Sequence, residues 1–110
     1  YSEWRKVAKN KSGDTFYVDF ERIRKHGGYV YFWVMEDYLK RRKGSYGHIS
    51  MKKYHQVDCK LFRYKGLSWS FHKEPMGGGT GEPDNTPDKE WTYPPPNSVN
   101  EHILKIICSR

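Results

Sequence analysis

The feature that most constrains this sequence is a run of seven apolar and aromatic residues, from Tyr29 to Met35, with a glycine pair before it and two acids after it. Its length and its β-branched and aromatic content predict a central β-strand. Successive side chains of a strand point to opposite faces of the sheet. One face of this strand carries Val30, Phe32 and Val34. The other carries Tyr31, Trp33 and Met35, so both faces must be covered by packing or used for binding.

Further strands are predicted on both sides of this run. A chain of 110 residues, 16% of them aromatic, is long enough for one modest core built on a few large rings, and we expect a single domain over residues 1–110. Residues 20–26 fit one helical or 3₁₀ turn, and Lys65-Gly66 fits a tight turn between the last two strands. Alternating or apolar stretches predict the other strands at 4–9, 15–19, 47–57, 59–64 and 67–72.

The last third of the chain predicts a loop followed by a helix. Residues 75–96 are rich in Gly, Pro, Asp, Asn and Thr, which predicts a long loop that Trp91 and Tyr93 pin to the body. Ser98 and Glu101 have the spacing of a capping box at a helix start. The apolar stripe of this helix is formed by Val99, Ile103, Ile106 and Ile107. The predicted fold class is α+β, with an antiparallel sheet of about six strands, one C-terminal helix packed on it and a long Pro/Gly-rich loop before the helix.

Two cysteines, Cys59 and Cys108, are too few for a zinc framework. Their even number predicts one disulfide, which would place the chain in an oxidising compartment and anchor the end of the helix to the sheet. The chain begins at Tyr1 without methionine, which fits a removed export signal or trimming and does not distinguish them. No apolar run approaches the roughly 20 residues that a membrane span needs.

The charge of the chain is basic, with 20 Lys and Arg against 13 Asp and Glu. Five of the acids lie between Glu74 and Thr92, which makes the rest more basic than the net charge of +7 suggests. Attraction to polyanions is therefore one interpretation, and lysines that only keep an aromatic sheet soluble are the other. The candidate binding residues are the basic loop, Lys40, Arg41, Arg42 and Lys43, joined by Lys52 and Lys53. The alternative is that this loop is a solvated hairpin tip.

The face of Tyr31 and Trp33 is the second candidate surface. A single helix covers only one face of a sheet, so this face is either a ligand groove or a dimer contact, or it is covered by Trp4, Trp91 and the 75–96 loop. Aromatic side chains beside a basic strip also suit nucleic acid, but the predicted disulfide disfavours that partner. The expected partners are a protein or a polyanionic glycan, with a homodimer as a further option.

No catalytic constellation is visible. The five histidines are scattered without metal-site spacing, and Ser68 or Ser70 with His72 lacks the context of a nucleophile elbow. The glycines of residues 76–81 lack the Gly-Lys-Ser/Thr ending of a phosphate-binding loop. We therefore expect no catalytic residues, no metal and no cofactor, and we predict that the protein is not an enzyme.

The sequence contains an ordered set of residues, namely Trp4, Tyr17-Val18-Asp19, Ile23, Val34 to Tyr38, Ser50, Asp58-Cys59, Met76 to Gly79, Trp91, Pro96-Asn97-Ser98 and Cys108. This set resembles the surface-adhesin protein E-like family of Gram-negative bacteria. The resemblance spans almost the whole chain. It implies an exported sheet of about six strands with a C-terminal helix tied to it by a disulfide, located in the periplasm or on the outer cell surface. It also implies dimerisation and binding of host extracellular-matrix and plasma proteins.

Two hypotheses of function follow from these observations. The first is an exported, non-enzymatic binding or adhesion module that recognises host matrix or acidic surface ligands through the basic loop and one sheet face. The second is a structural protein of the envelope that self-associates through a sheet edge or through the aromatic face.

Overall fold

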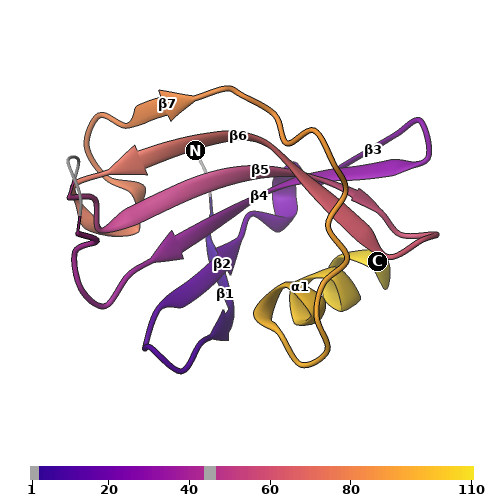
Figure 1. Ribbon diagram of the computed structural model, residues 1–110, viewed down its shortest axis with the longest axis horizontal. Coiled ribbons are helices and arrows are strands. Elements are labelled where there is room, and N and C mark those ends of the chain that lie inside the picture. The colour runs from indigo at the N-terminus through magenta and orange to yellow at the C-terminus, as the bar shows by residue number, and fades with distance from the viewer. Residues whose placement is uncertain (1–2, 44–46) are drawn as a thin grey trace.

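The computed structural model describes residues 3–43 and 47–110 and consists of one antiparallel sheet with a helix packed under it (Figure 1). The strands are β1 (Arg5–Lys9), β2 (Thr15–Val18), β3 (Arg24–His26), β4 (Tyr29–Asp37), β5 (Ser50–Asp58), β6 (Arg63–His72) and β7 (Glu82–Asp84). The helices are α1 (Val99–Cys108) and two 3₁₀ turns, η1 (Phe20–Arg22) and η2 (Pro75–Gly77). The predicted fold class is confirmed.

The predicted central strand is β4. The sheet order is β1-β2-β4-β5-β6-β7, and β3 also pairs with β4. Because β5 pairs along one edge of β4, β2 and β3 share the other edge, with β2 opposite residues 34–37 and β3 opposite residues 29–31. The middle of the sheet is therefore formed by two nine-residue strands that have neighbours on both sides.

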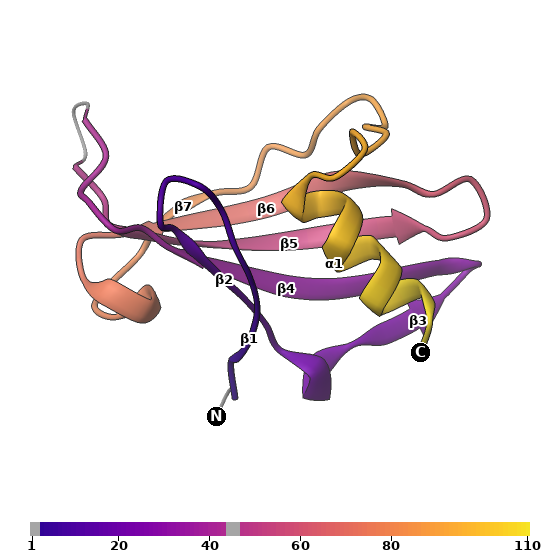
Figure 2. The same cartoon turned by 90° about the horizontal axis from the view of Figure 1, so that it is seen from below.

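The core lies between α1 and one face of the sheet, where the helix runs across β4 and β5 (Figure 2). As predicted, this face of β4 carries Val30, Phe32 and Val34, all buried. The helix contributes Ile103, Leu104 and Ile107, whereas Ile106 of the predicted stripe is only partly buried. The buried face of α1 is therefore rotated by part of a turn from the predicted one, and it includes Leu104 instead of Ile106.

The predicted cap starts the helix, with one change in its partners. The Glu101 N–H donates to Ser98 Oγ at 3.1 Å, as a capping box requires. The Glu101 carboxylate accepts from the Asn97 N–H at 2.9 Å, because the Ser98 N–H already donates to the Pro95 carbonyl. The cap therefore holds the end of the preceding loop as well as the first turn of α1.

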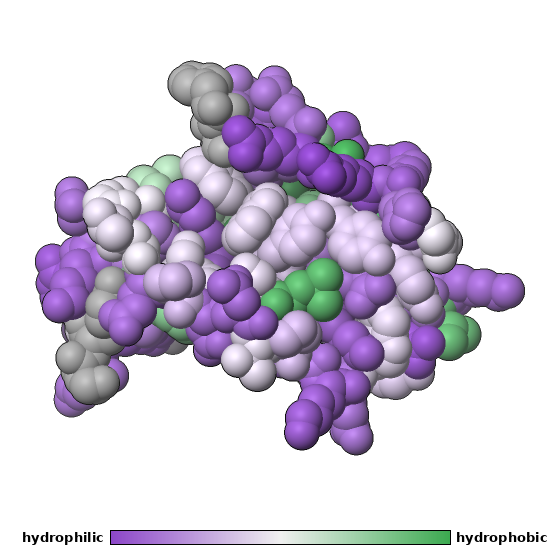
Figure 3. Space-filling view, turned by 90° about the horizontal axis from the view of Figure 1, so that it is seen from above, coloured by the Kyte–Doolittle hydropathy of each residue, from purple (hydrophilic) through white to green (hydrophobic). Residues whose placement is uncertain are grey.

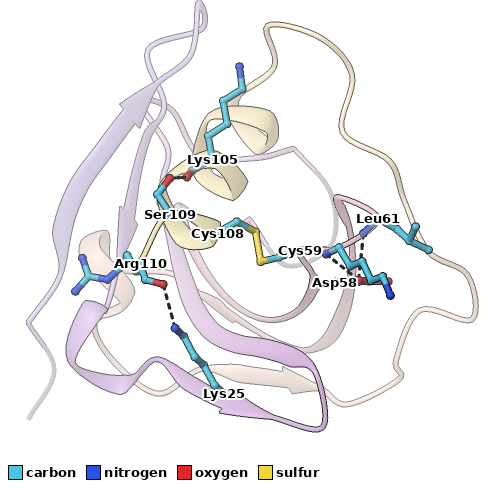
Figure 4. The surroundings of a disulfide bond; sticks show 9 residues. Lys25, Asp58, Cys59, Leu61, Lys105, Cys108, Ser109 and Arg110 are labelled. Atoms are coloured by element: carbon cyan, nitrogen blue, oxygen red, sulfur yellow. Dashed lines mark hydrogen bonds between the residues drawn. A yellow bond between two sulfur atoms is a disulfide. The ribbon is translucent and has the colours of Figure 1, made fainter.

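The predicted disulfide is confirmed and closes the other end of the helix. Cys108 is the last residue of α1, and Cys59 directly follows β5 (Figure 4). Their Cα atoms lie 5.6 Å apart, and 49 positions of sequence separate them. The helix is therefore fixed to the sheet by a covalent bond at its C-terminus, and in its first turn Asn100 Nδ2 donates to the Tyr64 hydroxyl of β6 at 2.9 Å.

Residues 67–72 form a strand as expected, but the turn at Lys65-Gly66 and the start of a separate strand at Cys59 are wrong. The chain turns at residues 59–62, where Asp58 Oδ1 accepts from the Lys60 and Leu61 N–H groups at 3.2 and 3.3 Å. β6 then runs without a break through Gly66. Tyr54 pairs with Ser68 and His55 pairs with Gly66, so Leu67 is an extra residue that forms a bulge.

Two other segments differ from expectation. The basic run followed by Gly44 predicts a long exposed hairpin loop over residues 38–46, but the side chain of Tyr38 is buried and its N–H donates to the Ile49 carbonyl at 2.9 Å. The last three residues of that segment lie outside the described residues. The 75–96 loop contains η2 and β7, and it continues along the edge of β6 through backbone bonds between Thr92 and Tyr64.

Candidate binding face

The side of the sheet opposite α1, here called the open face, carries a row of three aromatic rings. The register places Trp33 of β4 beside Tyr54 of β5, with ring centroids 4.9 Å apart, and Tyr31 stacks on Tyr54 at 6.1 Å. Gln56 Nε2 donates to the Tyr31 hydroxyl at 3.1 Å, which fixes the end of the row. Tyr31, Tyr54 and Trp33, the aromatic row, are all partly exposed.

Other segments cover the two ends of the open face but leave its middle accessible. At one end η2 packs on the sheet, where the Met76 N–H donates to Asp37 Oδ1 and the Gly77 N–H donates to Ser50 Oγ, both at 2.8 Å. At the other end Trp91 contacts Tyr29, with ring centroids 5.5 Å apart. The view onto this face shows pale side chains of intermediate hydropathy across its middle, bordered by hydrophilic ones (Figure 3).

The accessible middle of the face is hollowed into a groove. A cavity of about 570 Å³ lies between η1 with the start of β3 and the rings of Trp33 and Tyr54. A second cavity of about 290 Å³ adjoins it and shares Arg22 and Trp33. Together they form the aromatic groove, lined by Trp4, Asp19, Glu21, Arg22, Ile23, Arg24, Trp33, Lys52, Tyr54 and Ser70.

On the described part of the open face, basic side chains outnumber acidic side chains that are exposed and unpaired. Arg24 lies opposite Tyr31 in the register, and Lys52 lies opposite Met35. Asp19 is buried, and its carboxylate lies 3.5 Å from Arg22 Nε, which holds that guanidinium beside the groove. At the far end Arg63 and Lys65 lie over the Trp91 ring at 4.5 and 4.8 Å, and Arg63 also pairs with Asp58 at 2.9 Å. The groove is therefore both aromatic and basic.

The six residues of the predicted basic site do not form one patch. Lys52 lies on the open face, whereas Lys53 lies on the helix side, 5.6 Å from the Tyr64 and Trp69 ring centroids. Arg41 Nη1 donates to the Lys73 carbonyl at 2.7 Å. These three side chains therefore lie in different parts of the surface and cannot contact one ligand group together.

Arg42 is also engaged within the fold. It pairs with Asp14 at 2.8 Å and lies 3.9 Å over the Tyr38 ring. Burial acts to raise the pKa of Asp14, but hydrogen bonds from the Leu39 N–H and Asn10 and the charge of Arg42 outweigh it and hold that pKa below its usual value. Lys40 and Lys43 are exposed, and within the part of the chain that the structure describes their side chains form no bond.

A Ser–His pair lies at the η2 end of the open face. His72 Nε2 lies 2.8 Å from Ser70 Oγ, and its Nδ1 lies 3.1 Å from the Gly78 carbonyl. The ring is buried, which lowers the pKa of His72. Gly81 packs so closely on it that a Cβ there would lie 2.5 Å from Cε1. Within the fold, this pair holds the glycine loop onto the sheet.

The described residues contain neither a metal-binding cluster nor a helix of transmembrane character. Across residues 3–43 and 47–110, no group of three or more His, Cys, Asp or Glu side chains is arranged to hold a metal ion. Over the same residues, no helix has both the length and the apolar character that crossing a membrane requires.

Sequence reasoning proposed Tyr31 and Trp33 as a candidate surface but did not place Arg22, Arg24 and Tyr54 beside them, as the structure does. A signal for Arg24 was present, because a two-residue Gly-Gly turn at 27–28 predicts a hairpin that places Arg24 opposite Tyr31. The position of Arg22 depends on the 3₁₀ turn and on its pairing with Asp19, which no short pattern encodes.

Comparison with known proteins gives one family and one fold. A family model described as surface-adhesin protein E matches residues 4–109. Crystal form II of Haemophilus influenzae protein E superposes with a TM-score of 0.77 at 19% identity, covering 99% of this chain and 89% of that one. Its selenomethionine form gives 0.76 at 18% identity, covering 99% and 88%. No curated protein sequence matches this chain.

Proposed function

The chain belongs to the surface-adhesin protein E family, and from this premise we propose that it is a non-enzymatic adhesion module that binds host ligands through its open face. Surface adhesins act at the cell surface, and we propose export to the outer surface of a Gram-negative cell, where the disulfide is stable. Residues 1–110 would act as one binding domain without a cofactor.

The observation that carries this proposal is the aromatic row. Tyr31, Tyr54 and Trp33 stand on two central strands that are paired on both edges, so their backbone is held rigidly. Large aromatic side chains that stay partly exposed on a rigid surface are the residues that most often dominate binding energy. None of these three side chains belongs to the core on the other face, which favours a role of the three rings in recognition.

The basic loop is the second contact surface that we propose, with a reduced set of residues. Because Arg41 and Arg42 are engaged in the fold, a charge reversal at these positions would test stability as well as binding. Lys40 and Lys43 are the two positions where charge can be reversed with the least effect on the fold.

The test is retention of the purified protein on extracellular matrix laid down by epithelial cells. We expect Trp33→Leu to reduce retention about ten-fold or more, since a central aromatic side chain is removed. Lys40→Glu with Lys43→Glu should give a smaller, salt-dependent loss. The matched control is Lys105→Gln on α1, on the other side of the sheet. Full retention by both binding variants, with unchanged melting temperatures, would remove the proposal.

Self-association through the same face is the alternative function, and the partial exposure of Tyr31 and Trp33 favours it. An envelope structural protein of this kind would form a dimer or larger species at micromolar concentration. Sedimentation should then show this species, and Trp33→Lys should disperse it. A strict monomer that still binds matrix would reject self-association and leave the adhesion proposal in place.

A further inference from the structure

We propose that the aromatic groove is a carbohydrate site that binds an acidic sugar unit, one carrying a carboxylate or a sulfate group. This inference rests on the proposed function and names the ligand class of the open face. The groove has the size for it, since its larger cavity of about 570 Å³ lies within the roughly 300–1,000 Å³ of small-ligand sites.

The floor of the groove suits a ring that stacks. Trp33 and Tyr54 line the larger cavity, and their centroids lie 4.9 Å apart. The face of an aromatic ring carries partial negative charge, which attracts the polarised C–H groups of a sugar. Tyr31 lines neither cavity, but its ring contacts that of Tyr54 at 6.1 Å and continues the row beyond the groove.

The wall of the groove suits an anion. Arg24 is exposed, and within residues 3–43 and 47–110 its guanidinium has no bonded partner. A guanidinium offers paired N–H donors to a carboxylate or sulfate group, in a fork geometry that ammonium lacks. Arg22, oriented by Asp19, and Lys52 add positive charge along the same wall. Among the described residues that line the groove, the acids are Glu21, which is exposed to solvent, and Asp19, which is buried and pairs with Arg22.

The floor also disfavours an acidic peptide as the occupant. Peptides that bind to sheets usually add a strand to a free edge, where backbone groups supply the affinity. Here β4 lies between β5 and the pair β2 and β3, and β5 lies between β4 and β6. The groove floor therefore offers side chains rather than unpaired backbone, and the ligand must be recognised by stacking, charge and hydroxyl contacts.

Calorimetric titration with a heparin hexasaccharide tests the proposal. We expect Arg24→Gln to weaken the affinity about ten-fold, the loss of one charge-assisted contact, and Trp33→Leu to weaken it about two- to ten-fold. Lys105→Gln removes one positive charge from the helix side and should leave the affinity unchanged apart from a small general effect. Neutral dextran should bind far more weakly than the hexasaccharide.

Chemical-shift mapping gives a second measurement that does not depend on a folded variant. The ring signals of Tyr31, Trp33 and Tyr54 should move on addition of the hexasaccharide, and those of buried Tyr64 should not. An oligo-dT strand of equal charge that binds as tightly would overturn the assignment to a sugar. Shifts confined to residues 39–43 would place the glycan at the basic loop and overturn the groove site. Retention on matrix proteins without any glycan binding would reject this inference while the adhesion proposal survives.

Discussion

The nine residues of β4 are divided between two faces of the sheet that serve opposite purposes. On the helix side Phe32 is fully buried, with its ring stacked on His55 at 5.3 Å. One position further along, Trp33 points to the open face and lines the aromatic groove. Neighbouring large rings on one strand thus have different partners because only one face of the sheet is covered by α1.

This difference separates stability from binding within one strand. The covered face is closed by the helix, its cap and the disulfide, and its side chains contribute mainly to the free energy of unfolding. Among residues 3–43 and 47–110, the segments that cover the open face lie at its ends, with η2 at one end and Trp91 at the other. Substitutions on the two faces should therefore affect different measurements, and the following predictions test that separation from the largest effect to the smallest.

The largest effect is expected from Phe32→Ala. Removing this fully buried ring should lower the free energy of unfolding by about 3–5 kcal/mol, through lost burial and the cavity left behind. Trp33→Ala is the matched change on the open face and should cost clearly less stability, because that ring is partly exposed. Chemical denaturation of both variants checks this order, and equal losses would contradict the distinction between the faces.

Removal of the disulfide by Cys59→Ser with Cys108→Ser should rank second. The bridge spans 49 positions, and its loss should destabilise the protein by about 2–4 kcal/mol. The effect lies on the helix side, so variant molecules that remain folded should keep their affinity for the ligand. Denaturation and binding measured on one sample separate the two outcomes. A variant of normal stability and no binding would reverse our assignment of the faces.

Acidification should produce the next effect, through a histidine of the covered face. Burial, with a smaller contribution from the charge of Lys53, lowers the pKa of His55 well below its usual value of 6.5. The unfolded chain then takes up the proton first, so stability falls as the pH drops below about 6.5. One such group contributes at most about 2 kcal/mol between pH 6.5 and 5.

The measurement is the melting temperature at pH 7 and pH 5. The decrease in melting temperature from pH 7 to pH 5 should be smaller in His55→Phe than in the wild type, and the variant keeps a ring against Phe32. In His26→Gln, on exposed β3, the decrease should equal that of the wild type. Burial raises the pKa of Glu36, and this acts in the opposite sense, so variant and wild type must be compared at each pH. A pH dependence that is identical in all three proteins would exclude His55 as its source.

The smallest of these effects is expected from Ser98→Ala at the start of α1. It removes the acceptor of the Glu101 N–H and should cost about 1 kcal/mol. Thr at the same position keeps the acceptor and serves as the control. Thermal unfolding measures the difference, and a loss in the threonine variant as large as in the alanine variant would show that the cap bond is not its cause.

Much of the covered face was predictable from sequence because it follows from local patterns. The alternation along Tyr29 to Met35, the capping box and the even number of cysteines each depend on nearby residues or on simple counting. The sequence left open whether the second face is exposed or covered by Trp4, Trp91 and the 75–96 loop, and in the structure η2 and Trp91 of that loop contact it at its two ends. The resemblance to the adhesin family agreed with these inferences and is supported by the family model.

The parts that sequence did not predict depend on contacts between distant residues. Lys65-Gly66 has the composition of a turn, but Gly66 is needed inside β6, where a Cβ would lie 2.5 Å from the Trp69 ring. The actual turn follows Asp58, whose carboxylate accepts two backbone N–H groups. The groove required β3 and η1 to be placed against Trp33 and Tyr54, and no single pattern describes that arrangement.

Hydroxyl-radical footprinting of the protein bound to extracellular matrix tests the central claim most directly. We predict that Trp33 and Tyr54 lose most of their labelling on binding, while His102, exposed on α1, keeps its own. Unchanged labelling of Trp33 and Tyr54 in the bound protein, with protection at another surface, would contradict the claim that the open face is the binding face.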